Sequence, residues 1–152
     1  MTEVVLLRAG VSSAGVSVQE EVLAERQGHG RYRVLRSPGL VQGVAADDII
    51  DVDGNGDFHI VIRGGNVSVH VLAIRDMPRL EAVLRPALEA LGGRLDGKAP
   101  KLLVFTVPLS AGFVSIEEAL NRTLRGFADA EWYFGNVYDP VDGVTPLNWW
   151  KQ

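Results

Sequence analysis

Cysteine is absent from all 152 residues of the sequence. Its absence excludes a disulfide scaffold, a thiolate zinc site, an iron–sulfur cluster and a cysteine nucleophile. A chain without cysteine also fits a reducing compartment, so we expect a cytoplasmic protein. No apolar run approaches the roughly 20 residues of a membrane span. The run from Val4 to Leu7 is too short for a signal peptide and lacks a basic flank, so we expect no membrane partner.

An excess of basic residues is also missing. The sequence has 15 Lys and Arg against 19 Asp and Glu, which gives a formal net charge of −4 at pH 7. Proteins that bind nucleic acids usually present a basic surface, so we expect no nucleic-acid partner. The acidic balance favours a protein partner with a basic surface. The hydrophobic fraction of 47% and the charged fraction of 22% are those of a folded globular chain.

Alternation of apolar and polar residues dominates the first half of the chain. It predicts strands at residues 3–9, 16–26, 31–36, 48–53 and 58–63. Two glycine-rich segments, Gly28-His29-Gly30 and Gly54-Asn55-Gly56-Asp57, are typical of hairpin turns. We therefore expect residues 1–66 to form a strand-rich subdomain, either a small open barrel or a curled sheet.

A helical period replaces this alternation after a strand at residues 68–74. Apolar residues spaced by three and four form one stripe: Leu80, Val83, Leu84, Ala87, Leu88 and Leu91. Asp76 is the expected N-cap, and Gly92-Gly93 is the expected end of the helix. Pro86 lies inside the stripe and removes one hydrogen bond, so we expect a kink or a helix in two pieces.

A second helix is predicted by the capping box Ser115-Ile116-Glu117-Glu118 and by an apolar stripe that reaches Phe127. A short edge strand at 94–96 and strands at 101–107 and 131–138 complete the pattern. The predicted fold is therefore α+β. Residues 67–139 form a ferredoxin-like β-α-β-β-α-β unit after the strand-rich half, and residues 140–152 form an irregular tail.

The segment from Asp51 to Asp57 copies the opening of an EF-hand calcium loop, with oxygens at positions 1, 3 and 5 and glycine at position 6. Position 12 is Ile62, where a bidentate glutamate is needed, and the flanks predict strands. Asp-Gly and Asn-Gly are also typical of hairpin turns. We favour the turn and keep one calcium candidate: Asp51, Asp53, Asn55 and Asp57.

Catalytic patterns are missing as well. No two of His29, His59 and His70 stand at metal-ligand spacing. No serine occupies a Gly-x-Ser-x-Gly elbow, and no glycine-rich segment leads into Gly-Lys-Ser or Gly-Lys-Thr. We therefore expect no catalytic residue, no cofactor and no enzyme activity.

Two groups of side chains are candidates for contact with a partner protein. The acidic group contains Asp47, Asp48, Asp51 and Asp53, and the C-terminal group contains Tyr138, Asp139, Trp149 and Trp150. Surface charge raises association rates, and Trp and Tyr are frequent anchors of interfaces. The alternatives are a solvated acidic turn, and a tail folded back over a sheet whose core holds Trp132 and Phe134.

One stretch of the sequence resembles a bacterial family of unknown function, DUF4265. The matching residues are Glu21, Ala24, Glu25, Gly30 to Val34, Pro38, Gly43-Val44 and Asp47 to Ile50. The resemblance covers roughly residues 16–92 well. It implies a fold but no activity, because none is established for the family. Family members often have Arg-Ser-Gly-His-Ser-Thr where this chain has Arg63 to Ser68, so Asn66 replaces a histidine.

Three hypotheses for function follow. The first is a non-enzymatic protein that binds a partner protein as an inhibitor, such as an immunity protein against a bacterial toxin with a basic surface. The second is a regulatory module that binds a small molecule. The third is a cryptic enzyme that brings Asp and His side chains together from the two subdomains. Either a monomer or a homodimer is compatible with all three.

Overall fold

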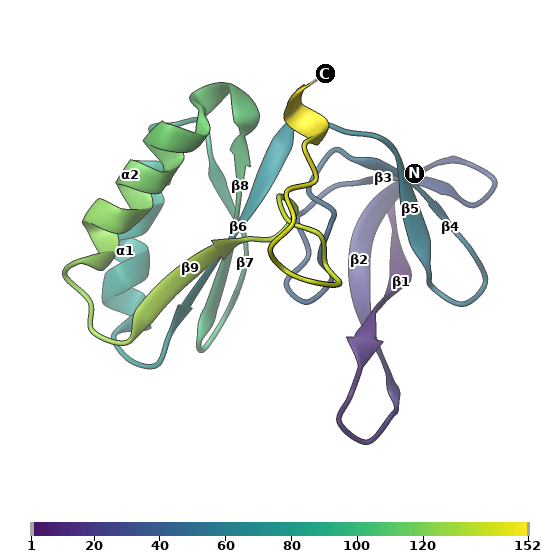
Figure 1. Ribbon diagram of the computed structural model, residues 1–152, viewed down its shortest axis with the longest axis horizontal. Helices are drawn as coiled ribbons and strands as arrows, with labels where there is room; N and C mark the ends of the chain where they lie inside the picture. Colours follow the sequence, from purple (N-terminus) through teal and green to yellow (C-terminus); the bar gives the residue numbers. More distant parts are fainter. Residues whose placement is uncertain (1, 152) are drawn as a thin grey trace.

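The computed structural model describes residues 2–151 and contains two β-sheets and two α-helices (Figure 1). The chain is therefore a mixed α+β protein rich in strands, as predicted. Within residues 2–151, no helix combines the length and the apolar character that crossing a membrane requires.

The first half forms a five-stranded antiparallel sheet in which neighbours in sequence are neighbours in space. Its strands are β1 (Thr2–Val11), β2 (Ser17–Gly28), β3 (Arg31–Val34), β4 (Ile49–Val52) and β5 (Phe58–Ile62). The sheet curls so that β1 approaches the turn between β4 and β5. There the backbone N–H of Arg8 in β1 donates to the carbonyl of Gly56 at 2.8 Å. Alternate residues such as Leu7, Val22 and Val34 fill a core of its own.

The second half has the order strand, helix, strand, strand, helix, strand. Its elements are β6 (Asn66–Ala73), α1 (Met77–Glu89), β7 (Arg94–Ala99), β8 (Leu102–Pro108), α2 (Phe113–Leu124) and β9 (Ala130–Phe134). Two 3₁₀ helices, η1 (Leu109–Ala111) and η2 (Trp149–Lys151), follow β8 and end the described chain. The four strands pair antiparallel in the order β7-β8-β6-β9, which makes β6 and β8 central.

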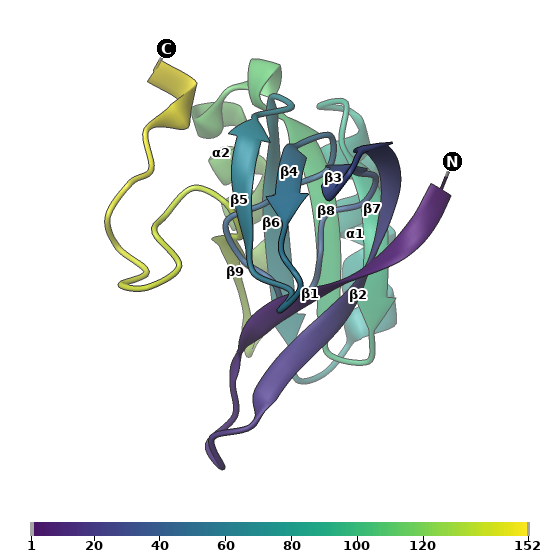
Figure 2. The ribbon, with the colours of Figure 1, turned by 90° about the vertical axis from the view of Figure 1, so that its right-hand side faces the viewer.

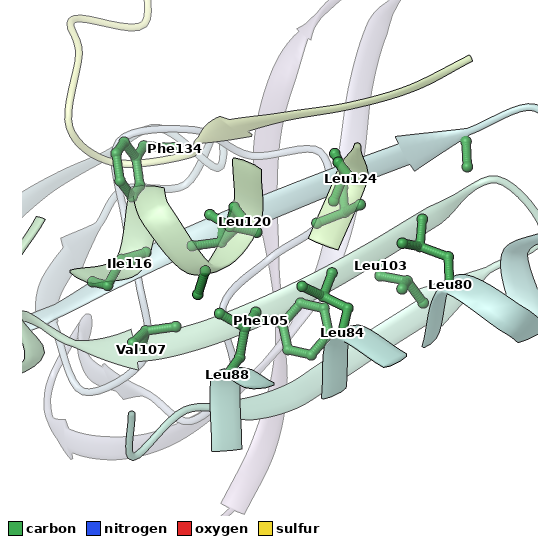
Figure 3. Packing of buried hydrophobic residues seen from close by; sticks show 14 of the residues in the cluster. Leu80, Leu84, Leu88, Leu103, Phe105, Val107, Ile116, Leu120, Leu124 and Phe134 are labelled. Carbon is green, nitrogen blue, oxygen red and sulfur yellow. The ribbon is translucent and has the colours of Figure 1, made fainter. Parts of the chain in front are cut away.

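Both helices cover one face of this second sheet, and the curled sheet faces the other (Figure 1). The alternation of β6 explains the two faces: Val67, Val69 and Val71 belong to the core under the helices, whereas Ser68 and His70 point the other way. The helix-side core is a dense layer of aliphatic and aromatic side chains (Figure 3). Burial of this layer is the main stabilising term of the second half.

The connection between β3 and β4, residues 35–48, lies between the two sheets and is bonded to both. The carboxylate of Glu20 in β2 accepts the backbone N–H groups of residues 39–41, each at 2.8 Å. The hydroxyl of Ser37 lies 2.6 Å from the hydroxyl of Thr106 in β8. This connection therefore fixes how the two halves sit against each other.

Helix α1 corrects the expected cap and excludes one of the two effects expected of Pro86. Asp76 does precede the helix, but its backbone is left-handed (φ 60°) and its side chain makes no capping hydrogen bond. Pro86 does not split the helix, which runs as one element from Met77 to Glu89. Leu84 and Leu88, on either side of Pro86, are both buried. Their packing offsets the hydrogen bond that the proline removes.

Helix α2 begins three residues earlier than predicted. Its N-cap is Gly112 (φ 88°), so Ser115 is the third helical residue and the predicted capping box is wrong. Phe113 extends the helix because its ring packs edge-on against Phe134 and Trp150, with centroids 5.5 and 5.1 Å away. These contacts join distant parts of the chain. The last strand is also shorter than predicted and ends at Phe134.

Candidate functional site

The calcium candidate residues lie in the hairpin between β4 and β5. Oδ1 of Asp53 accepts the backbone N–H groups of Asn55 (2.8 Å) and Asp57 (3.1 Å), which is the bonding of a turn. Asp51 is bound by both nitrogens of a fork from Arg31, at 2.7 and 2.9 Å. Across residues 2–151, no three Asp, Glu, His or Cys side chains gather in a way that would hold a metal.

Arginines also neutralise this acidic turn. The hydrogen bonds from Arg31 hold the pKa of Asp51 below its usual value, and Arg8 lies 3.5 Å from Asp57. The turn encloses a shallow hollow of about 250 Å³, in which His59 Nε2 lies 3.6 Å from Asp51. The carboxylate of Asp51 already accepts hydrogen bonds from Arg31, and the side chain of His59 is largely exposed to solvent. The pair therefore lacks the dry surroundings in which acid–base catalysis is effective.

Asp48 does not belong to the surface on which the sequence placed it. The residue is completely buried. Its Oδ1 accepts the backbone N–H of Gly64 at 2.8 Å, and its Oδ2 accepts that of Ala45 (2.9 Å) and Nη1 of Arg63 (3.2 Å). Burial raises the pKa of Asp48 despite these three donors. A side chain so enclosed cannot contact a partner, and its role is structural.

Asp47, beside it, is partly exposed, and its carboxylate is not a free charge. Its Oδ1 accepts Nη1 of Arg33 at 2.8 Å, and its Oδ2 accepts Nδ2 of Asn66 at 3.1 Å. Its backbone is left-handed (φ 73°), a conformation that asparagine and aspartate adopt more readily than other side chains.

His70 lies in a buried polar group on the face of β6 that points to the curled sheet. Its Nε2 is 3.0 Å from the hydroxyl of Ser68, and its Nδ1 is 3.1 Å from the hydroxyl of Tyr133. Burial lowers the pKa of His70 to about 4. His70 is fully buried and has both ring nitrogens bonded, so it is a neutral structural residue.

Gly135 makes room for this group. A Cβ at this position would lie 2.7 Å from both Nε2 of His70 and Oγ of Ser68. We expect Gly135→Ala to lower the free energy of unfolding by about 1–3 kcal/mol, because both side chains must leave their buried hydrogen bonds. Urea denaturation measures the change. Gly126→Ala, where the nearest atom would be 3.8 Å away, is the control and should change stability far less.

The C-terminal aromatic residues are held against the folded core. Nε1 of Trp149 donates to the carbonyl of Asn136 at 2.9 Å, and the ring of Trp150 packs on Phe113. A bridge between Tyr138 and Pro146 folds the tail back on itself. Trp149 and Trp150 are half-buried, while Tyr138 is 40% exposed. The tail therefore folds back over the core and still presents aromatic surface.

A groove of about 610 Å³ runs between β5 and this aromatic surface, and we call it the β5 groove. Its lining consists of Ile60, Val61, Ile62, Arg63, Gly65, Leu109, Trp149 and Trp150. Three consecutive residues of an extended strand cannot all point to one side. The backbone edge of β5 therefore borders the groove. Figure 2 shows β5 at the side of the curled sheet toward the C-terminal segment.

Trp150 also borders a smaller neighbouring hollow of about 210 Å³. That hollow is lined by Phe113, Glu117, Phe134, Val137, Tyr138, Pro146 and Trp150. The side chain of Trp150 thus borders both the β5 groove and the smaller hollow. The exposed side chain of Ile62 extends the apolar character of the β5 groove. Sequence reasoning found the tryptophans and Tyr138 but missed β5, because nothing in the sequence shows which strand the tail meets.

Comparison with known proteins places the chain in a family. Residues 20–130 match the family described as "Domain of unknown function (DUF4265)". The chain belongs to DUF4265. No curated protein matches it. A solved structure, titled "Novel crystal structure of a hypothetical protein from Neisseria gonorrhoeae", is 14% identical with a TM-score of 0.70. The match covers 89% of this chain and 94% of that one, and it shows a shared fold.

Some of the residues that resemble other DUF4265 members lie where the two halves meet. Nη1 of Arg63 donates to the carbonyl of Gly43 at 2.9 Å as well as to Asp48. The guanidinium of Arg63 also lies over the ring of Trp149, 5.1 Å from its centre. Asn66 bonds to Asp47 and to the carbonyl of Ala46 at 3.0 Å. In this DUF4265 chain, Gly43, Asp47 and Asp48 therefore belong to the junction that also holds Arg63, which contacts Trp149.

Proposed function

We propose that this protein binds a partner protein by accepting an extended segment of it along the edge of β5. The carrying observation is the β5 groove, in which an unpaired strand edge faces an apolar wall containing Trp149, Trp150 and Leu109. Addition of a strand to such an edge combines main-chain hydrogen bonds with pockets for alternate side chains.

The hydrogen-bonding pattern of the hairpin shows which backbone groups are available. The N–H of Asp53 donates to the carbonyl of Asp57, and the next hydrogen-bonded pair in this register is Asp51 with His59. The backbone groups of Phe58 and Ile60 therefore point away from β4. Among residues 2–151, β5 pairs with β4 and with no other strand. These outward groups are the expected partners of an added strand.

Aromatic anchors make this edge a better docking place than the other strand edges. Trp is the residue most enriched at positions that dominate binding energy. Trp149 is fixed from below by Arg63 and by its bond to Asn136, so little side-chain entropy is lost when a partner contacts it. The predicted interaction residues Tyr138, Trp149 and Trp150 lie on this surface or beside it.

Peptide display tests the proposal. Random peptides selected on the full chain should be enriched in extended segments with alternating apolar residues, and labelled protein should show perturbed amide signals in β5. Ile62→Lys places a charge at the groove, and we expect it to weaken the selected peptides by about tenfold or more. Ile74→Lys is the matched control: Ile74 is 67% exposed against 60% for Ile62, and it lies outside the groove.

Either of two results would contradict the proposal. One is a set of selected peptides whose affinity is the same for wild type and Ile62→Lys. The other is a set of perturbed amides that avoids β5 and the C-terminal tryptophans. Because both positions are exposed, thermal unfolding should confirm that the two lysine variants are equally folded.

Within protein binding, we propose the role of an inhibitor, such as an immunity protein that neutralises a toxin. The support is the net charge of −4 and the exposed side chain of Asp53, which suit a basic partner. Co-expression with the products of the flanking genes tests it. A toxic product whose effect is relieved by wild type and not by Ile62→Lys supports the role, and relief by both variants contradicts the use of the β5 groove.

The second half also supports a finer assignment of the fold. We infer a ferredoxin-like unit from the element order and from the strand order β7-β8-β6-β9, in which the first and third strands of the unit are central. The curled sheet then covers the face of that unit which its own helices leave open. This assignment concerns the scaffold and carries no function by itself.

A further inference from the structure

A second hollow, of about 430 Å³, lies between the two sheets and shares no residue with the β5 groove. Its walls come from β2, from residues 36–40, from β7 and from the first residues of β8. Both halves of the chain therefore contribute to it. Hollows of this size fall within the range of small-molecule sites.

Hydrogen bonds fix the walls of this inter-sheet hollow in place. Both oxygens of Glu20 are occupied by the backbone N–H groups of residues 39–41. Oδ2 of Asp96 accepts the backbone N–H of Ser37 at 2.8 Å and the hydroxyl of Thr106, and its Oδ1 accepts Nε of Arg94 at 2.8 Å. The loop is thus tied to both sheets, and the hollow is already formed in the free protein.

The floor supplied by the second sheet is apolar and made of small residues. Gly97 pairs with Val104 and Ala99 pairs with Leu102, so these four residues face the same side. A Cβ at Gly97 would have no atom within 4 Å, which shows open space above the strand. Together with Leu40 at the loop, this floor leaves room for an apolar group.

Charges at the rim are of both signs. Within the described part of the chain, the carboxylate of Glu21 and the guanidinium of Arg36 make no ion pair and no side-chain hydrogen bond, and both residues line the hollow. Lys98 pairs with Leu103 on the helix side, and its Nζ lies 3.3 Å from Glu81. The carboxylate of Glu21 and the guanidinium of Arg36 are thus available to bind a charged ligand beside the apolar floor.

We propose that the inter-sheet hollow binds a small zwitterion with an apolar body, the chemistry of a free amino acid with an apolar side chain. Arg36 pairs with the carboxylate of the ligand and Glu21 with its ammonium group. The apolar side chain lies over Gly97, Ala99 and Leu102. This site is separate from the β5 groove, and its occupancy does not depend on the function proposed above.

Calorimetry on the full chain tests the site with L-leucine, L-phenylalanine and L-tryptophan, each beside its N-acetylated amide. We expect at least one free amino acid to bind about tenfold or more tightly than its blocked form, because blocking removes both charges. Gly97→Leu should abolish binding by filling the floor. Gly54→Leu, at a turn glycine whose Cβ would also meet nothing within 4 Å, should bind as wild type does.

Three results overturn this inference. They are no heat from any of the three amino acids at about 10 mM, equal affinity for free and blocked forms, and unchanged binding by Gly97→Leu. Arg36→Gln provides a second variant that keeps the fold, because Arg36 is exposed and unpaired in the described structure. It should weaken the free amino acid about tenfold and leave the blocked amide unaffected.

Discussion

Replacing Asp48 with alanine is expected to lower the free energy of unfolding by about 3–5 kcal/mol. The change removes the acceptor of two backbone N–H groups, those of Ala45 and Gly64, and leaves the guanidinium of Arg63 without its carboxylate. Asp48 is fully buried, so water cannot replace the lost partner without opening the junction between the two halves.

Urea denaturation measures this loss, with Asp53→Ala as the control. Asp53 is exposed and its bonds lie within one hairpin turn, so its replacement should cost less than about 1 kcal/mol. The double variant Asp48→Ala/Arg63→Ala should cost less than the sum of the single changes, because the two side chains interact directly. A loss below 1 kcal/mol for Asp48→Ala would show that Arg63 and the loop find other partners.

Acidification is expected to destabilise the protein through His70. Burial lowers its pKa from 6.5 to about 4 in the folded chain. Between these two pH values, His70 is protonated in the unfolded chain and neutral in the folded chain. The free energy of unfolding is therefore unaffected by His70 above pH 6.5 and decreases as the pH falls toward 4. The difference of pKa corresponds to about 3 kcal/mol. Asp48 acts in the opposite direction, because burial raises its pKa.

Comparison of variants isolates the contribution of His70. His70→Gln should show a weaker dependence of unfolding free energy on pH between 6.5 and 4 than wild type, even if it is less stable at every pH. Equal slopes for wild type and His70→Gln would mean that His70 is protonated in the folded protein and would contradict its neutral role.

Local patterns in the sequence predicted most of the elements, and long-range contacts explain where they failed. Alternation located the strands of the curled sheet, and the stripe through Leu80, Leu84 and Leu88 located α1. The start of α2 was wrong because Phe113 is drawn into the helix by Phe134 and Trp150, which are distant in sequence. Likewise, Pro86 does not divide α1 into two pieces, because burial of Leu84 and Leu88 outweighs the lost hydrogen bond.

The sequence predicted only those residues of the candidate site whose residue type alone suggests contact with a partner. Trp149 and Trp150 stood out as large aromatics near the end of the chain, and the structure places both beside the β5 groove. Asp48 was assigned to the surface because its neighbours are acidic, and the donors that bury it come from other segments. Neither hollow was visible in the sequence, because each is lined by segments that meet only after folding.

The loop at residues 35–48 has a consequence for how the chain opens. Its N–H groups at residues 39–41 are held by a carboxylate on a strand of one sheet, and the same loop is bonded to a strand of the other. Among these residues Val41 is buried, whereas Leu40 is 56% exposed. Hydrogen exchange should therefore find the amide of Val41 slower than that of Leu40. Because the loop is bonded to both sheets, the two halves should open as one cooperative unit.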